Sequence, residues 1–235
     1  MKIIGIDSSG LSASVAILED DKLTAEYFVN YKKTHSQTLL PMLDEISRMA
    51  ELDLFTVDAI AISKGPGSFT GLRIGSATAK GLGLALNIPI VEVSTTAGMA
   101  YNFCYSDRLI CPIMDARRSQ VYTGLYEFTD GEFKTLLTDT AEPIESTIER
   151  VNGCGRPVIF MGDGVAVFKE TIEKECKVPF SFAPAHLCMQ RASSIAVYGM
   201  SLYKEGKIVS AKDHAPEYLR LSQAERERNE AINGH

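Results

Sequence analysis

Apolar residues recur along this chain with two periods, and the change from one to the other predicts where strands give way to helices. Short runs rich in β-branched residues are typical of strands, and apolar positions three and four apart are typical of helices. The first half therefore predicts three strands followed by a helix, a strand, a helix and a strand. The strands are expected at residues 2–6, 13–18, 23–30, 59–62 and 90–93, and the helices at 36–50 and 71–87.

The second half of the chain repeats this layout. A strand, a turn that contains Asp115 and a second strand occupy residues 109–128, and they align without a gap on the strand, Asp7 turn and strand of residues 3–18. Such repetition is typical of a duplicated unit. We expect an α/β protein of two duplicated domains, 1–107 and 108–235, each a mixed sheet flanked by helices. Later elements are expected at 144–152, 158–161, 165–176, 180–182 and 192–203, with a charged, turn-rich stretch at 130–139 and a frayed tail from Glu225.

One predicted helix carries small residues at every fourth position. Gly71, Gly75, Ala79 and Gly83 fall on one face, because residues four apart are neighbours on a helix. Each glycine costs a helix about 1 kcal/mol relative to alanine, so this face is expected to pack unusually closely against something. The pattern leaves two interpretations open: a tight contact inside the same domain, and a docking face for another protein.

The turn before this helix, Gly65-Pro66-Gly67, is glycine-rich in the manner of loops that bind phosphate. A P-loop requires Gly-Lys followed by Ser or Thr, whereas Gly71 is followed by Leu-Arg here. We therefore interpret the segment as a structural turn, with Ser68 or Thr70 as the cap of the helix that follows.

Composition excludes several classes of protein. The chain has 235 residues, of which 45% are hydrophobic and 23% charged, as is ordinary for a globular protein of one large or two modest domains. Its net charge of −6 argues against a chain that grips nucleic acid unaided, since that affinity requires clustered Lys and Arg. Five cysteines without C-x-x-C spacing are typical of reduced thiols, and no signal peptide or membrane-spanning run is visible. We expect a cytoplasmic protein.

No residue pattern predicts a catalytic metal or a hydrolytic triad. Two histidines at i and i+4 on a helix can share one metal ion, but no two of the four histidines have that spacing. Serines in turns, such as Ser8 and Ser9, lack a G-x-S-x-G elbow, and serine in a turn usually acts as a hydrogen-bonding cap. We expect no catalytic residue and no metal in this chain.

Five segments spread along the chain carry a family resemblance. They are residues 4–9, 35–41, 65–73, 114–122 and 216–220. In these segments the chain resembles the TsaB (YeaZ) family of bacterial proteins for synthesis of threonylcarbamoyladenosine (t6A) in tRNA. That family belongs to the TsaD-like branch of the actin, sugar-kinase and Hsp70 superfamily. The resemblance implies two actin-like (ribonuclease H-like) domains.

The resemblance also implies an accessory role. Members of the family are partners of the catalytic paralogue TsaD, which works with the ATPase TsaE to transfer a threonylcarbamoyl group to N6 of the adenosine 3′ of the anticodon. In TsaD an H-x-x-x-H pair holds the metal, and Thr95 and Met99 stand at those positions here. Threonine and methionine are poor ligands for a hard divalent metal. The chain is therefore expected to be a non-catalytic subunit that reaches tRNA only through the complex and contacts no membrane; a homodimer of the isolated chain is left open.

In this family the first two helices meet the equivalent helices of TsaD or of a second copy. Here both helices carry more apolar and small surface than one sheet face requires. The expected interface residues are His35, Ser36, Leu39, Leu40, Leu43, Gly71, Arg73, Gly75, Ala79 and Gly83.

Superfamily kinases hold nucleotide phosphates between the two Asp-containing hairpins. By resemblance, the candidate residues of a vestigial nucleotide cleft are Asp7, Ser9, Asp115 and Gly162. However, Arg117-Arg118 replaces the small residues expected in the second hairpin, and an Asp7 that only caps its turn is an equal interpretation. No cofactor is expected to be required, and weak or interface-shared ATP or ADP is left open. Two alternative functions are also left open, an ATP-dependent phosphotransferase that uses Asp7 and, less favoured, a peptidase.

Overall fold

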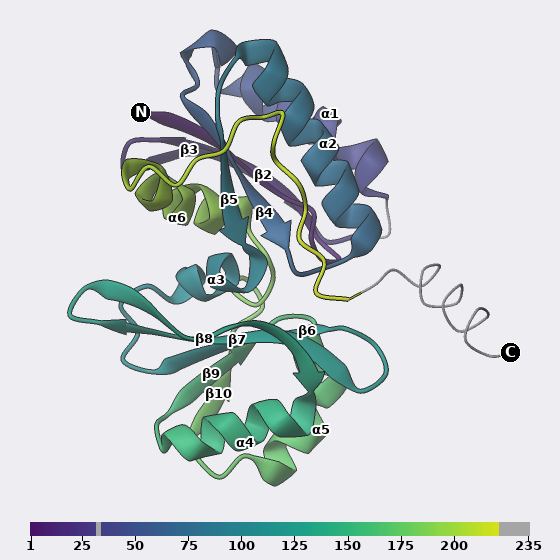
Figure 1. The fold of residues 1–235 in the computed structure, drawn as a ribbon, viewed down its shortest axis with the longest axis vertical. Helices are drawn as coiled ribbons and strands as arrows, with labels where there is room; N and C mark the ends of the chain where they lie inside the picture. Colours follow the sequence, from purple (N-terminus) through teal and green to yellow (C-terminus); the bar gives the residue numbers. More distant parts are fainter. Residues whose placement is uncertain (32–33, 221–235) are drawn as a thin grey trace, which may run out of the picture.

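The computed structural model describes residues 1–31 and 34–220, and it contains two five-stranded mixed sheets stacked along the long axis of the molecule (Figure 1). The first sheet has the order β3-β2-β1-β4-β5, with β1 antiparallel to β2 and parallel to β4. Its central strand is covered on both faces, so successive apolar residues such as Ile3 and Ile4 are both fully buried. The strands are β1 (Lys2–Asp7), β2 (Ala13–Glu19), β3 (Lys22–Val29), β4 (Ala59–Gly65) and β5 (Ile90–Ser94).

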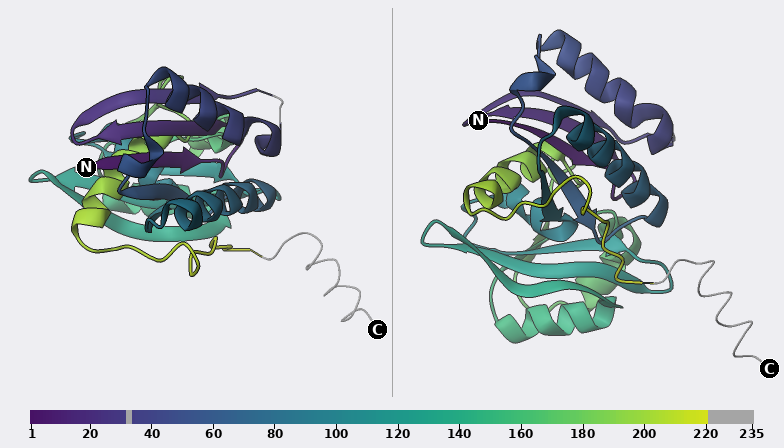
Figure 2. Two further views of the ribbon diagram at one scale, coloured as in Figure 1. Left: turned by 90° about the horizontal axis from the view of Figure 1, so that it is seen from above. Right: turned by 45° about the horizontal axis from the view of Figure 1, so that its top comes forward.

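Helices cover both faces of the first sheet (Figure 2). α1 (His35–Met49) and α2 (Phe69–Leu86) pack on one face, and α6 (Ala192–Lys204) packs on the other. Ser68 caps α2, because its side chain accepts a hydrogen bond from the N–H of Gly71. The short 3₁₀ helix η1 (Leu54–Thr56) precedes β4.

The second sheet repeats the first. Its order, β10-β9-β6-β7-β8, matches the first sheet when each strand is replaced by its counterpart, which confirms the predicted duplication. α4 (Ile144–Cys154) and α5 (Gly164–Glu175) cover its outer face, while α3 (Thr95–Ala100) lies between the two sheets (Figure 1). The short helix η2 (Tyr101–Phe103) follows α3. The strands are β6 (Leu109–Asp115), β7 (Gln120–Thr129), β8 (Glu132–Pro143), β9 (Val158–Met161) and β10 (Phe180–Phe182).

One predicted loop is a strand. The charged stretch at 130–139 was expected to be turn-rich, but only Asp130 and Gly131 form a turn, and β8 then pairs with β7 as far as Pro143. β8 lies at the edge of its sheet, and much of its length is exposed or only partly buried. Without a buried face, the apolar alternation that identifies a strand is lost from the sequence.

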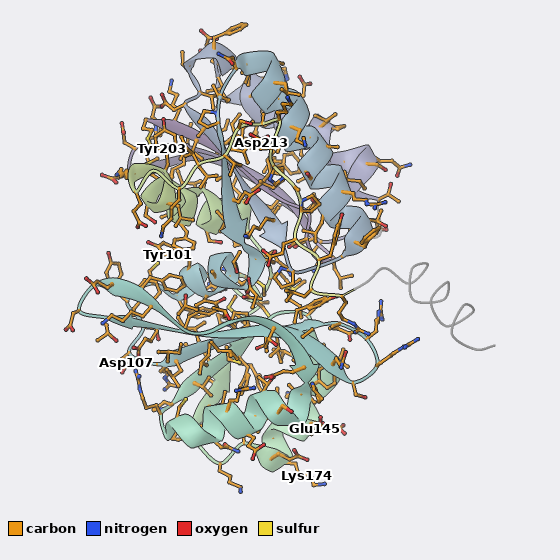
Figure 3. The ribbon with its side chains drawn as sticks, in the orientation of Figure 1. Tyr101, Asp107, Glu145, Lys174, Tyr203 and Asp213 are labelled. Carbon is orange, nitrogen blue, oxygen red and sulfur yellow. The ribbon has the colours of Figure 1, made fainter. Side chains whose placement is uncertain are left out.

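The chain returns to the first sheet after β10. The predicted boundary near Asp107 (labelled in Figure 3) falls between β5 and β6 and so separates the strands of the two sheets. However, α6 packs on the inner face of the first sheet, beside Ile3, Ala61 and Val93. Residues 192–220 therefore lie with the first sheet, although the division at 107 assigned them to the second domain.

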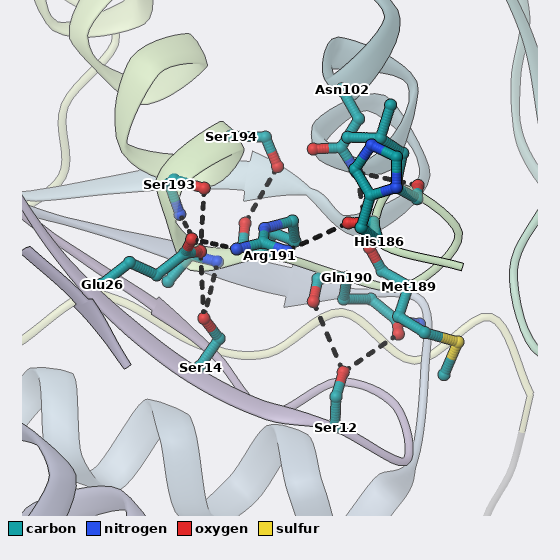
Figure 4. A network of polar contacts seen from close by, with 12 residues as sticks. Ser12, Ser14, Glu26, Asn102, His186, Met189, Gln190, Arg191, Ser193 and Ser194 are labelled. Carbon is teal, nitrogen blue, oxygen red and sulfur yellow. Dashed lines mark hydrogen bonds and ion pairs between the residues drawn. The ribbon is translucent and has the colours of Figure 1, made fainter. Parts of the chain in front are cut away.

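A polar network fixes this return (Figure 4). Glu26 on β3 pairs with Arg191 and accepts hydrogen bonds from the N–H and hydroxyl of Ser193, at 3.1 and 2.8 Å. Ser14 on β2 accepts from the N–H of Ala192 at 3.1 Å. Two N–H groups in the first turn of α6 are thus satisfied by side chains of the first sheet.

The segment after α6 runs back across the first domain. It is coloured yellow in Figure 1, and Asp213, labelled in Figure 3, lies on it beside α2. We call residues 207–220 the strap. Within the described ranges, no helix has both the length and the apolar character needed to cross a membrane. The predicted frayed tail from Glu225 lies outside the described residues.

Candidate functional site: the interdomain cleft and the outer helices

The first hairpin places Asp7 beneath a cavity. The side chain of Asp7 is 1% exposed, and its Oδ1 accepts hydrogen bonds of 2.9 Å from both the N–H and the hydroxyl of Ser9. Burial raises the pKa of Asp7, and the bonds from Ser9 oppose that rise. Asp7 Oδ2 has no hydrogen-bond partner among the described residues. Asp7 therefore holds the turn, while Ser9 and Gly10 line the cavity above it.

The turn between β4 and α2 packs directly on the first hairpin. The N–H of Ser68 donates to the carbonyl of Ser9 at 2.7 Å. A Cβ on Gly67 would lie 2.3 Å from the same carbonyl oxygen, and so only glycine fits there. The glycine-rich turn is thus a structural turn, as predicted.

The polar groups of the second hairpin are bonded to other groups of the chain. Asp115 donates its N–H to Asp163 Oδ1 at 3.2 Å and accepts the N–H of Arg117 at 2.8 Å. Arg117, Arg118 and Ser119 all have left-handed backbones, with φ of 65°, 56° and 57°. The Arg117 side chain is 84% exposed and lies 3.4 Å from the Asp115 carboxylate.

Gly162 does not line the cavity, and it packs tightly against the backbone of β6. Its φ is 106°, and a Cβ there would lie 2.2 Å from the carbonyl oxygen of Ile113. The next residue, Asp163, lines the cavity, and burial raises the pKa of its carboxyl group. Sequence reasoning named Gly162 and missed the adjacent residue, Asp163.

The cleft between the domains has a volume of about 680 Å³. Its walls come from the first hairpin, the β4–α2 turn, the second hairpin, the start of α5 and the end of the strap. Of the predicted cleft residues, Ser9 and Asp115 face it, whereas Asp7 and Gly162 lie behind it. The strap residues Tyr218 and Arg220 line it and were not predicted.

Three backbone N–H groups at the cleft are bonded within the chain. A phosphate cradle needs free backbone N–H groups, but those of Ser9, Asp115 and Arg117 are bonded to carboxylates of the chain itself. Two carboxylates, Asp115 and Asp163, line the cavity together with two cations, Arg117 and Arg220.

The predicted glycine ridge faces inward. Gly71, Gly75, Ala79 and Gly83 are all buried in the chain itself. A Cβ on Gly71 would lie 2.1 Å from the carbonyl oxygen of Ser8, and a Cβ on Gly75 would lie 2.4 Å from the Ser8 hydroxyl. These residues were expected at a partner interface, and that assignment is wrong. The ridge lets α2 approach the first hairpin, which was the other interpretation of the pattern.

The α1 residues of the predicted interface divide in two. Leu39 and Leu43 are buried in the core, whereas Ser36 and Leu40 are exposed, Leu40 by 55%. His35 is partly buried, and its Nε2 lies 2.9 Å from the carbonyl oxygen of Gly10. The interface assignment is therefore wrong for Leu39 and Leu43, because the core of the first domain covers them.

A second small-residue ridge on α2 faces solvent. Arg73, Ala77, Gly81 and Ala85 also recur at every fourth position, and all four are exposed. They lie two residues away from the buried ridge, which places them about 200° around the helix. A Cβ on Gly81 would meet no atom within 4 Å. We call these four residues the outer ridge. Sequence reasoning recognised the four-residue spacing of small residues on α2, but it assigned the partner interface to the buried face.

Thr95 and Met99, the two positions at which the resemblance would place a metal-binding pair, both lie on α3. Thr95 is 0% and Met99 1% exposed, so both are core residues. Within residues 1–31 and 34–220, no group of three or more His, Cys, Asp or Glu residues is placed to hold a metal ion.

Comparison with known proteins assigns the family. Residues 22–228 match the family model of TsaD, tRNA N6-adenosine threonylcarbamoyltransferase. The tRNA threonylcarbamoyladenosine biosynthesis protein TsaB of Bacillus subtilis is 35% identical over 225 residues, which are 96% of each chain. This chain belongs to the TsaB family. The Escherichia coli TsaB is 29% identical over 94% of this chain and 95% of its own.

Solved structures agree with the TsaB assignment. YeaZ from Pseudomonas aeruginosa superposes with a TM-score of 0.80 at 27% identity, covering 93% of this chain and 99% of its own. A polyphosphate/ATP-glucomannokinase from Arthrobacter superposes with a TM-score of 0.52 at 12% identity, covering 87% of this chain and 99% of its own. The second likeness concerns the fold alone, which is the actin-like fold of sugar kinases.

Proposed function

We propose that this chain is a non-catalytic subunit of the complex that makes t6A in tRNA, and that it docks on a TsaD-type catalytic subunit. The observation that carries the proposal is the pair Thr95 and Met99. In a chain of this family, these residues stand where the catalytic paralogue has histidines, and both are buried in α3. A metal-dependent transfer step then belongs to the partner, and TsaE supplies the ATPase of the complex.

The outer ridge is the docking surface in this proposal. Ala77, Gly81 and Ala85 present almost no side chain, so the backbone of a partner helix could approach α2 closely there. The exposed apolar residues Leu40 and Leu84, 55% and 62% exposed, add area that a partner would bury. A second copy of this chain could use the same surface when no catalytic subunit is present.

Two other functions are less well supported by the contacts in the cleft. A phosphotransferase needs a phosphate cradle, and the N–H groups of Ser9, Asp115 and Arg117 are bonded to carboxylates of the chain. A peptidase needs a free serine hydroxyl, but that of Ser8 donates to the carbonyl of Gly71 at 2.9 Å and that of Ser9 to Asp7.

Reconstitution tests the proposed function. The chain alone, the catalytic subunit with TsaE, and all three together are incubated with tRNA, ATP and threonylcarbamoyl-adenylate, and t6A is measured by mass spectrometry of nucleosides. Only the complete mixture should form t6A over many turnovers. Formation of t6A by the isolated chain, or an undiminished rate without it, would contradict the proposal.

A further inference from the structure

The strap is fastened to the first domain along most of its length. Val209 and Ile90 exchange two backbone hydrogen bonds of 2.9 Å, which adds a short rung beside β5. Lys80 on α2 donates to the carbonyls of Lys212 and His214, at 3.0 and 2.9 Å. These contacts hold the strap against α2 and the edge of the first sheet.

Its next residues close over the end of β4. The N–H of Glu217 donates to the carbonyl of Lys64 at 2.7 Å, and the two side chains form an ion pair of 2.8 Å. A Cβ on Gly65 would lie 2.2 Å from the Glu217 carbonyl oxygen, so the strap fits tightly on this turn.

The strap then reaches the outer ridge and the second domain within three residues. The Tyr218 ring packs on Phe69 in a tilted arrangement, with 4.5 Å between centroids, and its hydroxyl accepts a hydrogen bond of 3.3 Å from Arg73 Nε. The Arg73 guanidinium also lies 4.0 Å from the centre of the Phe69 ring. Two residues later, Arg220 donates to the carbonyl of Ala116, in the second hairpin. Arg73 is thus part of the outer ridge and also contacts the strap.

The two linkers between the domains meet away from this point. Asn102, just after α3, donates to the carbonyls of Leu187 and Met189, which precede α6. Both linkers are therefore joined beside α3, and opening about them would separate the first and second hairpins. The bond from Arg220 to Ala116 crosses the cleft between those hairpins.

We infer that the strap is a latch that holds the interdomain cleft closed and is released through Arg73. A group that binds Arg73 breaks its hydrogen bond to Tyr218. Tyr218 then no longer holds Arg220 in place, and the cleft widens. A carboxylate on a partner helix seated on the outer ridge has the chemistry to do this. That last step rests on the proposed function, whereas the latch itself does not.

Distance measurement on the isolated full chain tests the latch. Spin labels are placed at Ala77→Cys on α2 and Glu170→Cys on α5, in a Cys154→Ser background, and the distribution of distances is measured by pulsed electron resonance. Arg220→Ala and Tyr218→Ala should both lengthen and broaden the distribution. Arg117→Ala is the matched control, since it removes a cation from the same cavity without crossing it, and it should leave the distribution unchanged.

The variants separate the parts of the inference. An unchanged distance in Arg220→Ala, which alters only the last described side chain, overturns the latch even where Tyr218→Ala fails to fold. An equal lengthening in Arg117→Ala overturns the assignment to Arg220. Arg73→Ala should also lengthen the distance, and an unchanged distribution there overturns the release through Arg73. None of these results depends on partner binding, which a titration with the catalytic subunit measures separately.

Discussion

The hydroxyl of Ser94 donates a hydrogen bond of 2.9 Å to Asp139 Oδ1 and so joins the end of β5 to β8 in the other sheet. The same oxygen accepts from the hydroxyls of Thr96 and, at 3.2 Å, Tyr126. Burial raises the pKa of Asp139, and the bonds from the three hydroxyls oppose that rise. A carboxyl group with three donors thus ties the domains together beside α3.

This arrangement predicts a pH dependence of stability. Because the pKa of Asp139 is raised in the folded protein, the native state binds its proton more tightly than the unfolded chain does. The contribution of Asp139 to stability therefore falls as pH rises from the ordinary value of 3.8 through the raised one. Asp139→Asn cannot ionise and does not lose this contribution. As pH rises through this window, its free energy of unfolding should therefore increase relative to that of the unmodified chain.

Urea unfolding at a series of pH values measures this difference. Asp44→Asn, at an exposed position on α1, serves as the control. Parallel stability curves for Asp139→Asn and the unmodified chain would remove Asp139 from the pH dependence. Asp7 and Asp163, whose pKa values are also raised, contribute with the same sign, so part of the slope should persist in the variant.

Glu26→Ala should destabilise the return of the chain to the first sheet. The variant leaves Arg191, only 27% exposed, without its ion partner and removes the acceptor of two bonds from Ser193. Loss of one partner of a buried ion pair costs about 3 kcal/mol, to be measured by denaturant unfolding. Glu45→Ala is the control, because its pair with Arg48 is exposed on α1 and should contribute little. Equal losses in the two variants would contradict the role given to Glu26.

The five cysteines should differ strongly in reactivity. Cys154 is exposed, whereas burial raises the pKa of Cys111 to about 12 and that of Cys104 to about 11. Since the thiolate is the reactive form, a disulfide reagent near neutral pH should modify Cys154 quickly, the partly buried cysteines more slowly and Cys111 only on unfolding. A fast phase that survives Cys154→Ser would show that another cysteine is accessible.

The buried ridge predicts a loss of stability on substitution. In Gly75→Leu the added Cβ alone would lie 2.4 Å from the Ser8 hydroxyl, so α2 must move away from the first hairpin. Overpacking of this kind costs roughly 1–3 kcal/mol. Gly81→Leu should instead gain up to about 1 kcal/mol, because leucine favours a helix and the site is open. Thermal unfolding of both variants compares the two ridges, and equal shifts would contradict their assignment to opposite faces.

Much of this fold follows from local pattern. The strands of both sheets except β8, and helices α1, α2, α4, α5 and α6, were predicted because each has one buried face or stripe. The six residues of α3 are all buried and carry no helical period, so that helix was missed. The strap has no repeating pattern either, since its carbonyls and single side chains make its contacts.

The choice between the ridges could not be made from the sequence. Gly71 and Gly75 have the same spacing as Ala77 and Gly81, and nothing in the helix itself tells which face meets the sheet. The decision comes from Ser8, whose carbonyl and hydroxyl occupy the space in which side chains at Gly71 and Gly75 would lie. Residues 63 or more positions apart thus determine which surface remains free.

Binding of the catalytic subunit to Gly81→Leu and to an unmodified chain, measured by isothermal titration calorimetry, tests the central claim most directly. The account predicts that Gly81→Leu stays folded and loses at least tenfold in affinity, since about 1.4 kcal/mol of lost packing corresponds to that factor. Leu23→Ala, at an exposed apolar position on β3, should bind like the unmodified chain. Full affinity in a folded Gly81→Leu would contradict docking through the outer ridge.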